Sequence, residues 1–176
     1  MTNNKIKEIF VYDLEATCGL PEGTQSEIIQ LGYCFLNLKT KAITNCKSII
    51  VKPQYTSITK FCTDLTGITQ EQVNKGINFK QLISHLMDLK LKYRMCVCFG
   101  HDHLFIQNEC ISKNVEYPFS VSNLINLCNL IKLRKKTEKG ISLINALKEN
   151  NLEFEGIQHN AMYDAYNTAR LFSKYF

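Results

Sequence analysis

The feature that most constrains this chain is a short buried strand that ends in two carboxylates. Ile9 to Tyr12 is a run of apolar and aromatic residues with a β-branched content that predicts a buried strand. Asp13 and Glu15 follow at its end, and side chains two positions apart on a strand point to the same face. Neighbouring carboxylates repel, and desolvation increases that cost. The pair indicates either a site for a hard divalent cation such as Mg²⁺ or Mn²⁺, or a solvated strand end before a turn.

Length and composition are those of one globular domain over residues 1–176. The chain is 45% hydrophobic, which is enough for a sizeable core, and no linker, repeat or low-complexity tract divides it. Its net charge of +5 permits a polyanionic partner without requiring one. No stretch approaches the ~18 apolar residues of a membrane span, and Met1 to Lys5 lack the apolar core of a secretory signal. We therefore expect an intracellular, cytoplasmic protein that does not enter a membrane.

Eight cysteines are scattered along the chain, mostly inside apolar runs. Without a secretory signal, they are expected to be buried free thiols in a reducing compartment. Cys96 and Cys98, followed by His101 and His103, raise the alternative of a zinc site. Structural zinc sites use wider spacings than the single residue that separates each pair here. A strand that turns both thiols into one core face is therefore favoured.

The remaining pattern predicts a mixed α/β sheet covered by helices, because leading strands that form hairpins are followed by alternating helices and strands. The expected strands, besides the opening one, are 27–38, 43–51, 95–99 and the first part of 123–131, which then runs into a helix. The other expected helices, after short helical turns within 57–75, are 79–91, 102–113, 142–149 and 163–175. Asn78 is expected to cap the helix that follows it.

The last predicted helix offers a further metal ligand. Asp164 falls in its first turn, where the helix dipole tolerates a carboxylate. Ala161, Ala165 and Ala169 repeat every four residues, and this stripe of small side chains would let the helix lie close to the sheet. Asp164 would then approach the opening strand. His159 lies just ahead on a loop; a lone histidine is more often structural or exposed, so it becomes a catalytic candidate only together with the carboxylates.

Asp102 is the third acidic candidate. It follows the strand at 95–99 and opens the helix at 102–113. Aspartate at such a position is also a common helix N-cap. Capping and metal binding explain Asp102 equally well at this point.

Taken in order, these positions resemble a known enzyme family. Asp13-x-Glu15, a middle aspartate and His159-x-x-x-x-Asp164 are similar to the DEDDh 3′→5′ exonucleases, which have a ribonuclease H-like fold. Further segments resemble the branch that trims histone-mRNA stem-loops, small RNAs and ribosomal RNA ends, and its bacterial relatives: Asp13–Cys18, Glu27–Gly32, Val51–Pro53, Phe61–Thr69 and Phe154–Gly156. The resemblance runs from residue 8 to residue 173. It departs before Asp102, where the family often has Trp-Gly and two residues; here Phe99-Gly100 and one residue precede it.

The resemblance implies an α/β fold with a ribonuclease H-like mixed five-stranded sheet, antiparallel over its first three strands and then parallel, flanked by helices. It also implies a metal-dependent 3′→5′ exoribonuclease that binds two Mg²⁺ or Mn²⁺ ions per active site and releases 5′-nucleoside monophosphates. The implied ligands are Asp13, which bridges both ions, with Glu15, Asp102 and Asp164. His159 is the implied general base.

The implied partner is the 3′ end of a nucleic acid, with RNA favoured over DNA, and no protein partner is indicated. The implied substrate-binding residues are Leu14, Ala16, Thr17, Thr66, Gly67, Ile68 and His159. An ordinary turn is the alternative for 66–68. The basic run at 132–139 either follows the phosphate backbone or is a solvated helix end. A 3′→5′ DNA exonuclease of the repair or proofreading kind shares the five site residues, and a non-catalytic nucleic-acid binder on the same fold is the third possibility.

Overall fold

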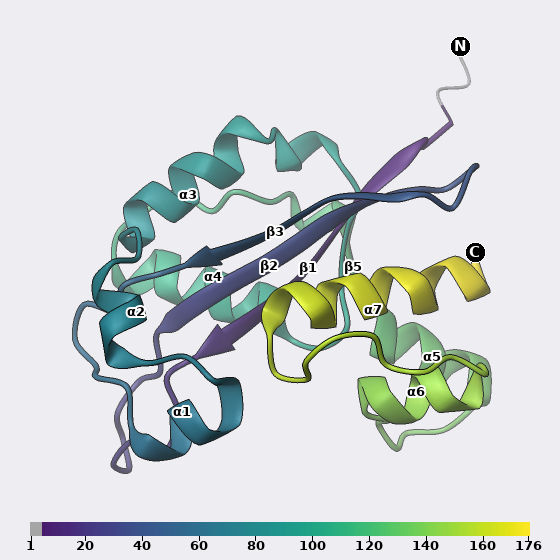
Figure 1. Cartoon of the computed structure of the whole chain (residues 1–176). Coiled ribbons are helices and arrows are strands. Elements are labelled where there is room, and N and C mark those ends of the chain that lie inside the picture. Colours follow the sequence, from purple (N-terminus) through teal and green to yellow (C-terminus); the bar gives the residue numbers. More distant parts are fainter. Residues whose placement is uncertain (1–4) are drawn as a thin grey trace.

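A computed structural model describes residues 5–176 of this chain. Residues 1–4, most of the segment in which no secretory signal is expected, lie outside the described part. A five-stranded sheet forms the centre of the fold (Figure 1). Its strands, in the spatial order β3-β2-β1-β4-β5, are β1 (Glu8–Ala16), β2 (Ile28–Asn37), β3 (Ile43–Ile50), β4 (Cys96–Cys98) and β5 (Leu124–Asn126). The first three pair antiparallel, whereas β4 and β5 run parallel to β1. The predicted fold class is confirmed.

Seven helices lie within the described residues, close to the predicted ranges. They are α1 (Lys60–Thr66), α2 (Gln70–Asn74), α3 (Phe79–Asp88), α4 (Asp102–Ser112), α5 (Leu127–Lys135), α6 (Leu143–Glu149) and α7 (Ala161–Tyr175). The Asn78 side chain caps α3 by accepting a hydrogen bond from the Gln81 N–H, as expected. α3 ends three residues earlier than predicted, because the chain turns through Lys90 in a left-handed conformation (φ 55°). Among residues 5–176, no helix is both long and apolar enough to cross a membrane.

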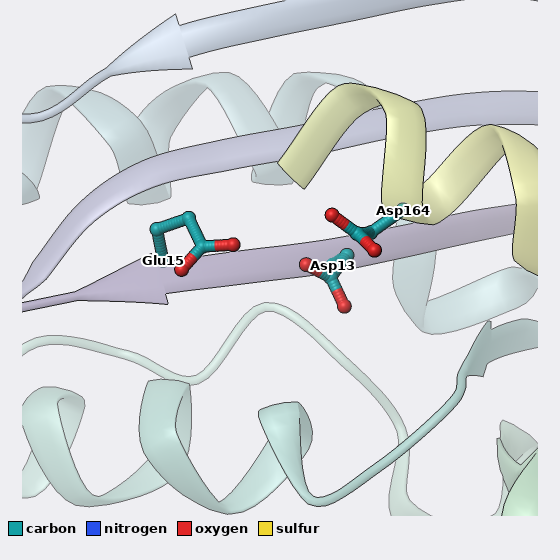
Figure 2. Close-up of side chains that lie close together, drawn as sticks. All are labelled: Asp13, Glu15 and Asp164. Carbon is teal, nitrogen blue, oxygen red and sulfur yellow. The ribbon is translucent and has the colours of Figure 1, made fainter. Parts of the chain in front are cut away.

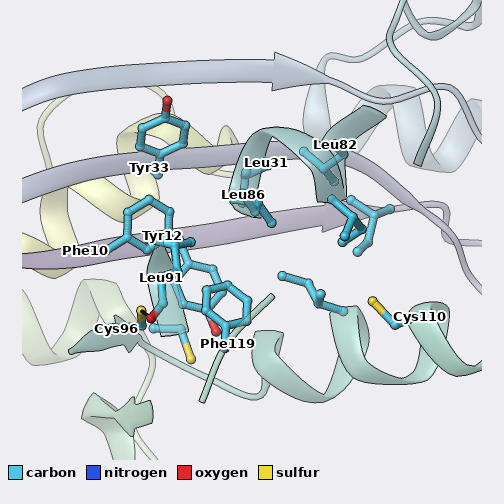
Figure 3. Packing of buried hydrophobic residues seen from close by; sticks show 14 of the residues in the cluster. Phe10, Tyr12, Leu31, Tyr33, Leu82, Leu86, Leu91, Cys96, Cys110 and Phe119 are labelled. Carbon is cyan, nitrogen blue, oxygen red and sulfur yellow. Dashed lines mark hydrogen bonds between the residues drawn. The ribbon is translucent and has the colours of Figure 1, made fainter. Parts of the chain in front are cut away.

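The alternation of side chains along β1 divides the core into two halves. Phe10 and Tyr12 face α3 and α4, where the Tyr12 ring stacks on Phe119 and the Phe10 ring packs near it at a tilt (Figure 3). Ile9 and Val11 point the other way, into a second apolar cluster with α5, α6 and α7. Since β1 has a neighbour on each side, its apolar stretch is completely buried. Asp13 and Glu15 continue the face of Ile9 and Val11, so both carboxylates are directed towards α7.

Helix α7 lies unusually close to β2. Ala161, Ala165 and Ala169 are fully buried against the sheet, so the role predicted for this stripe is confirmed. Gly32 makes the approach possible, because a Cβ atom there would lie 1.9 Å from the carbonyl carbon of Ala161. The side-chain oxygen of Gln30 accepts a 2.9 Å hydrogen bond from the Ala161 N–H. This contact fixes the first turn of α7 on the sheet.

The cysteines behave largely as expected. All eight are free, and five of them are buried. Cys46, on the edge strand β3, is exposed, contrary to the general expectation of burial. Cys96 and Cys98 both lie in the core cluster beneath α3 and α4, as expected for two thiols on one face of a strand.

Candidate active site

Three carboxylates from two distant parts of the chain meet at the end of β1. Asp13 and Glu15 come from β1, and Asp164 comes from the first turn of α7 (Figure 2). One oxygen atom of each lies within 4.8 Å of one oxygen of the other two. In the register of the sheet, Asp13 lies opposite Gly32, which is the residue that lets α7 approach. The close helix contact and the carboxylate cluster are therefore parts of one arrangement.

The electrostatics of this cluster favour a bound cation. Burial raises the pKa of Asp13 well above its usual value, and the neighbouring carboxylates raise it further. Burial, together with the charges of Asp164 and Asp102, raises the pKa of Glu15 to about 7. The pKa of Asp164 rises to about 6, chiefly through burial, although the nearby His159 opposes the shift. Protons or a cation must offset this concentration of negative charge.

The available ligand atoms fit a hard divalent cation. The Oδ2 atom of Asp164 is buried and has no hydrogen-bond partner among residues 5–176. Buried polar atoms normally have hydrogen-bond partners. A buried carboxylate oxygen without one, inside an acidic cluster, is therefore suited to bind a metal ion. All the donor atoms are oxygens, which Mg²⁺ and Mn²⁺ prefer over softer metals. Asp13, Glu15 and Asp164 could together hold such an ion.

Asp102 is the fourth carboxylate, and it does not cap its helix. The N-cap position of α4 belongs to His101, and Asp102 is the first helical residue. Burial raises the pKa of Asp102, while the backbone N–H groups of Gly100 and Leu14 counteract that rise. Among the charged neighbours of Asp13, Asp102 contributes most to its raised pKa. Asp102 thus faces the cluster, although it is not one of the three residues whose oxygens converge within 4.8 Å.

The shortened loop before Asp102 is anchored rather than loose. The Gly100 carbonyl oxygen accepts a 2.6 Å hydrogen bond from the Asn126 side chain at the end of β5. The Phe99 carbonyl oxygen accepts one from the Cys128 N–H at the start of α5. These two contacts tie the start of α4 to the neighbouring parallel strand and its helix.

His159 lies on the exposed loop just before α7, where the sequence indicated. Its backbone is left-handed (φ 57°), and its proximity lowers the pKa of Asp164. The loop is held from behind by Asn167, whose buried side chain bonds to both backbone groups of Glu155 and to the Tyr163 carbonyl oxygen. Gly156 is needed in this loop, because a Cβ atom there would lie 2.1 Å from the Tyr163 ring. The exposed imidazole therefore projects from a well-supported loop.

The residues predicted to bind the terminal nucleotide are mostly engaged within the protein. The Thr17 hydroxyl is buried and accepts a hydrogen bond from the Glu27 N–H, while the Thr17 N–H donates to the Glu27 carbonyl oxygen. The Thr66 hydroxyl donates to the Cys62 carbonyl oxygen and accepts from the Ile68 N–H. These contacts give Thr17 and Thr66 structural roles.

The other predicted pocket residues vary in exposure. Ile68 is buried, and Gly67 ends α1 in a left-handed conformation (φ 73°), as in an ordinary helix-terminating turn. Leu14 and Ala16 are partly exposed on the last residues of β1. Nucleotide binding by this set of residues stays a prediction.

A buried ion cluster that the sequence patterns did not predict lies next to Thr17. The Lys113 ammonium contacts Glu27 at 2.8 Å and Glu109 at 2.7 Å, and all three side chains are at most 7% exposed. Burial alone would raise the pKa of Glu27, but hydrogen bonds from Lys113 and from the 54–56 loop lower it to about 2. The cluster joins α4, which begins with Asp102, to the start of β2 and to Thr17. Glu27 at the head of an apolar strand was the available signal.

The alternative zinc site is not formed. The Cys98 sulfur lies 3.8 Å from Nδ1 of His103, but within residues 5–176 only the three-carboxylate cluster brings enough ligand atoms together for a metal.

Comparison with known proteins agrees with this geometry. The family RNase_T, described as Exonuclease, matches residues 10–172. Human 3'-5' exoribonuclease 1 is 29% identical over 179 residues, which cover 93% of this chain and 50% of the relative. The DNA polymerase III PolC-type of Mycoplasmopsis pulmonis (strain UAB CTIP) is 28% identical over 162 residues, which cover 90% of this chain and 11% of that protein.

Among solved structures, the nuclease domain of 3'hExo, a DEDDh family member bound to rAMP, superposes with a TM-score of 0.86 at 26% identity. The match covers 97% of this chain and 92% of that one. The chain spans about half the length of the exoribonuclease relatives it matches.

Proposed function

Since the chain belongs to the RNase T exonuclease family, of the DEDDh type, we propose that it is a metal-dependent 3′→5′ exoribonuclease. It hydrolyses the last phosphodiester bond of an RNA 3′ end and releases a 5′-nucleoside monophosphate. The observation that carries the proposal is the convergence of Asp13, Glu15 and Asp164, with one buried oxygen of Asp164 unpaired. Buried carboxylates in this arrangement have an evident purpose only with a cation between them.

We propose that Asp13, Glu15, Asp102 and Asp164 would together hold two Mg²⁺ or Mn²⁺ ions. When bound, such ions act as Lewis acids that lower the pKa of water and stabilise charge on the scissile phosphate and the leaving oxygen. The four carboxylates would position the cations, and without cations their negative charge repels other anions. Asp102, held by the anchored loop before α4, completes the set from the opposite side of β1 to Asp164.

The proposed general base is His159. One of its ring nitrogens accepts the proton of the attacking water, and histidine suits this role because it changes charge near neutral pH. Its exposed position at the mouth of the cluster leaves room for a substrate to bind beneath it. Asp164 follows five residues later, and the nearby His159 holds the pKa of that carboxyl lower than burial alone would set it.

The preference for RNA is supported by the relatives. Several similar proteins are named exoribonucleases, and the structure of the 3'hExo nuclease domain contains rAMP. DNA is the second candidate substrate, because the matching DNA polymerase III PolC-type has a DNA-directed name at a comparable identity. The five proposed site residues serve either nucleic acid equally, since the distinction depends on contacts to the 2′-hydroxyl.

The deciding experiment compares RNA and DNA oligonucleotides of the same single-stranded sequence, labelled at the 5′ end, with Mn²⁺ or with EDTA. We expect a ladder that shortens from the 3′ end, release of 5′-monophosphates, a faster reaction on RNA and no reaction in EDTA. Asp13→Asn is the matched control and should be inactive. Faster digestion of DNA would replace the RNA proposal with the DNA one. Binding without metal-dependent hydrolysis would indicate the non-catalytic alternative.

A further inference from the structure

A hollow of about 560 Å³ lies between α5 and α6, outside the carboxylate cluster. Its polar lining consists mainly of Lys132, Lys135, Lys139, Lys148, Ser142 and Asn145. None of the residues that line it is aromatic or an aspartate, and Glu149 is its one acidic member. It combines several ammonium groups with hydroxyl and amide donors in one concave surface.

The segment that surrounds the hollow carries most of the excess charge of the protein. Residues 131–149 contain six lysine or arginine side chains and two glutamates, a net charge of +4, against +5 for the whole chain. Lys135 is paired with Glu149. Lys132, Lys139 and Lys148 have no carboxylate within ion-pair distance in the described part of the chain. Unpaired ammonium groups around one hollow repel each other, and an anionic ligand would relieve that repulsion.

The backbone around the hollow is well defined by hydrogen bonds. α5 ends with Lys136 in a left-handed conformation, and the Thr137 N–H donates to the Lys132 carbonyl oxygen. The Ser142 side chain caps α6 by accepting from the Asn145 N–H. Beneath the hollow, Ile131 packs into the apolar cluster shared with α7. The lysines therefore project from a fixed frame.

The position of the hollow relative to the carboxylates follows from the topology. β1, β4 and β5 are parallel, so the carboxyl ends of all three meet at one edge of the sheet. Asp13 and Glu15 lie at this edge on β1, and α5 starts there directly after β5 (Figure 1). α6, in turn, packs against α7, whose first turn carries Asp164. The end of α6 meets the other end of α7, where the Asn150 side chain donates a 3.0 Å hydrogen bond to the Tyr175 hydroxyl. The hollow therefore lies towards the C-terminal end of α7, about 16 Å along that helix from Asp164, so only a strand of several nucleotides can reach both.

We propose that this hollow binds the phosphodiester backbone of the substrate strand upstream of its 3′ end. The inference rests on the proposed exonuclease function and assigns part of its substrate binding to Lys132, Lys139 and Lys148. Lysine contacts to phosphates give affinity without sequence information. Because aromatic stacking platforms are missing from the lining, this surface holds strands regardless of base.

The test uses Lys132→Gln/Lys139→Gln. Each phosphate contact to a single strand contributes about 0.7 to the slope of log K against log salt, which is about fivefold in affinity at about 0.1 M salt. The double variant should therefore lower kcat/KM for an RNA of about 20 nucleotides by about 25-fold and make its salt slope shallower by about 1.4. Hydrolysis of a dinucleotide, too short to reach the hollow, should stay unchanged. Circular dichroism of the double variant and of the wild type checks that the substitutions leave the fold intact.

The matched control is Lys39→Gln/Lys41→Gln. These exposed lysines occupy the β2–β3 turn, at the opposite end of the sheet from the carboxylates, and their loss removes the same charge. The proposal is overturned if the control loses as much activity as the test variant, or if dinucleotide and long RNA lose activity equally. It is also overturned if a polyglutamate peptide competes with RNA for the hollow as well as an unrelated single-stranded RNA does.

Fluorescence anisotropy of the long RNA, measured with both variants in an Asp13→Asn background, reports binding without hydrolysis. If the wild type hydrolyses neither substrate but this binding difference persists, the exonuclease proposal fails and the nucleic-acid surface stands. If hydrolysis is normal and the binding difference is missing, the inference about the hollow fails alone.

Discussion

Gly32→Ala is expected to disable the site without touching any carboxylate. The added Cβ would lie 1.9 Å from the Ala161 carbonyl carbon, 2.0 Å from the Met162 nitrogen and 2.1 Å from the Ala161 oxygen. All three are backbone atoms at the start of α7, so no side-chain rotation can make room. To restore an ordinary contact of about 3.4 Å, the first turn of α7 must move about 1.5 Å away from β2. Asp164 moves with that turn, away from Asp13.

The energetic cost follows from the same contact. Overpacking lowers the free energy of unfolding by about 1–3 kcal/mol. The Gly32→Ala clash belongs at the upper end of this range, because the atoms that it meets are backbone atoms of Ala161 and Met162. For a domain of this size each kcal/mol lowers Tm by about 2–4 °C, so a fall of about 6–12 °C is expected. A displacement of about 1 Å at a catalytic group costs about 100-fold in rate, which sets the expected loss of hydrolysis.

Thermal unfolding, calorimetric titration with Mn²⁺ and hydrolysis of RNA would measure these three effects. Gly140→Ala is the control, because its Cβ would meet nothing within 4 Å and its backbone is not left-handed. It should match the wild type in Tm and Mn²⁺ binding. A Gly32→Ala protein that melts within about 2 °C of the wild type and binds Mn²⁺ equally well would refute the reasoning, since the helix would then tolerate the added atom.

Three further changes test other parts of the structure. Lys113→Met should lower the free energy of unfolding in urea by about 3–5 kcal/mol, because it leaves two buried glutamates without their cation. Lys60→Met, at an exposed ion pair, should lower it by less than about 1 kcal/mol. Equal losses in the two variants would contradict this. In metal-free protein the pKa values of Glu15 and Asp164 are about 7 and about 6, so both carboxyls keep protons at pH values where the unfolded chain has lost them. Tm should therefore fall as the pH rises from about 4.5 to about 7. Mn²⁺ should restore Tm at the upper end, and a flat profile in EDTA would argue against the buried cluster. His159→Gln should lower single-turnover hydrolysis by about 10²–10⁴-fold with unchanged Mn²⁺ affinity; weakened metal binding would instead make it a ligand.

Patterns that repeat over a few residues were sufficient to predict the elements. The apolar run before Asp13 gave the central strand, and the four-residue spacing of alanines identified the face of α7 that meets the sheet. The apolar segment 123–131 was correctly interpreted as a strand leading into a helix. These features depend on side-chain period and local propensity, which any one segment carries by itself.

Roles that depend on distant partners could not be predicted in this way. Asp102 had two equal explanations until the fold placed His101 at the N-cap and turned the Asp102 carboxylate towards Asp13. The hydroxyl of Thr17, a predicted pocket residue, accepts a hydrogen bond from the Glu27 N–H instead. The Glu27 side chain is in turn paired with Lys113, which lies 86 residues further along the chain. Pairings of this kind follow from strand register and helix packing, which no local pattern encodes.

By itself, the sequence determined which side chains are candidates for the chemistry: two carboxylates on one face of a buried strand, a carboxylate in a first helical turn and a histidine before it. Only the tertiary structure decided that they meet, because that requires Gly32 to lie opposite Asp13 and to leave room for α7. It also decided that the lysines of α5 and α6 surround one hollow. Local propensity selects the residues, and long-range packing brings them within reach of one another.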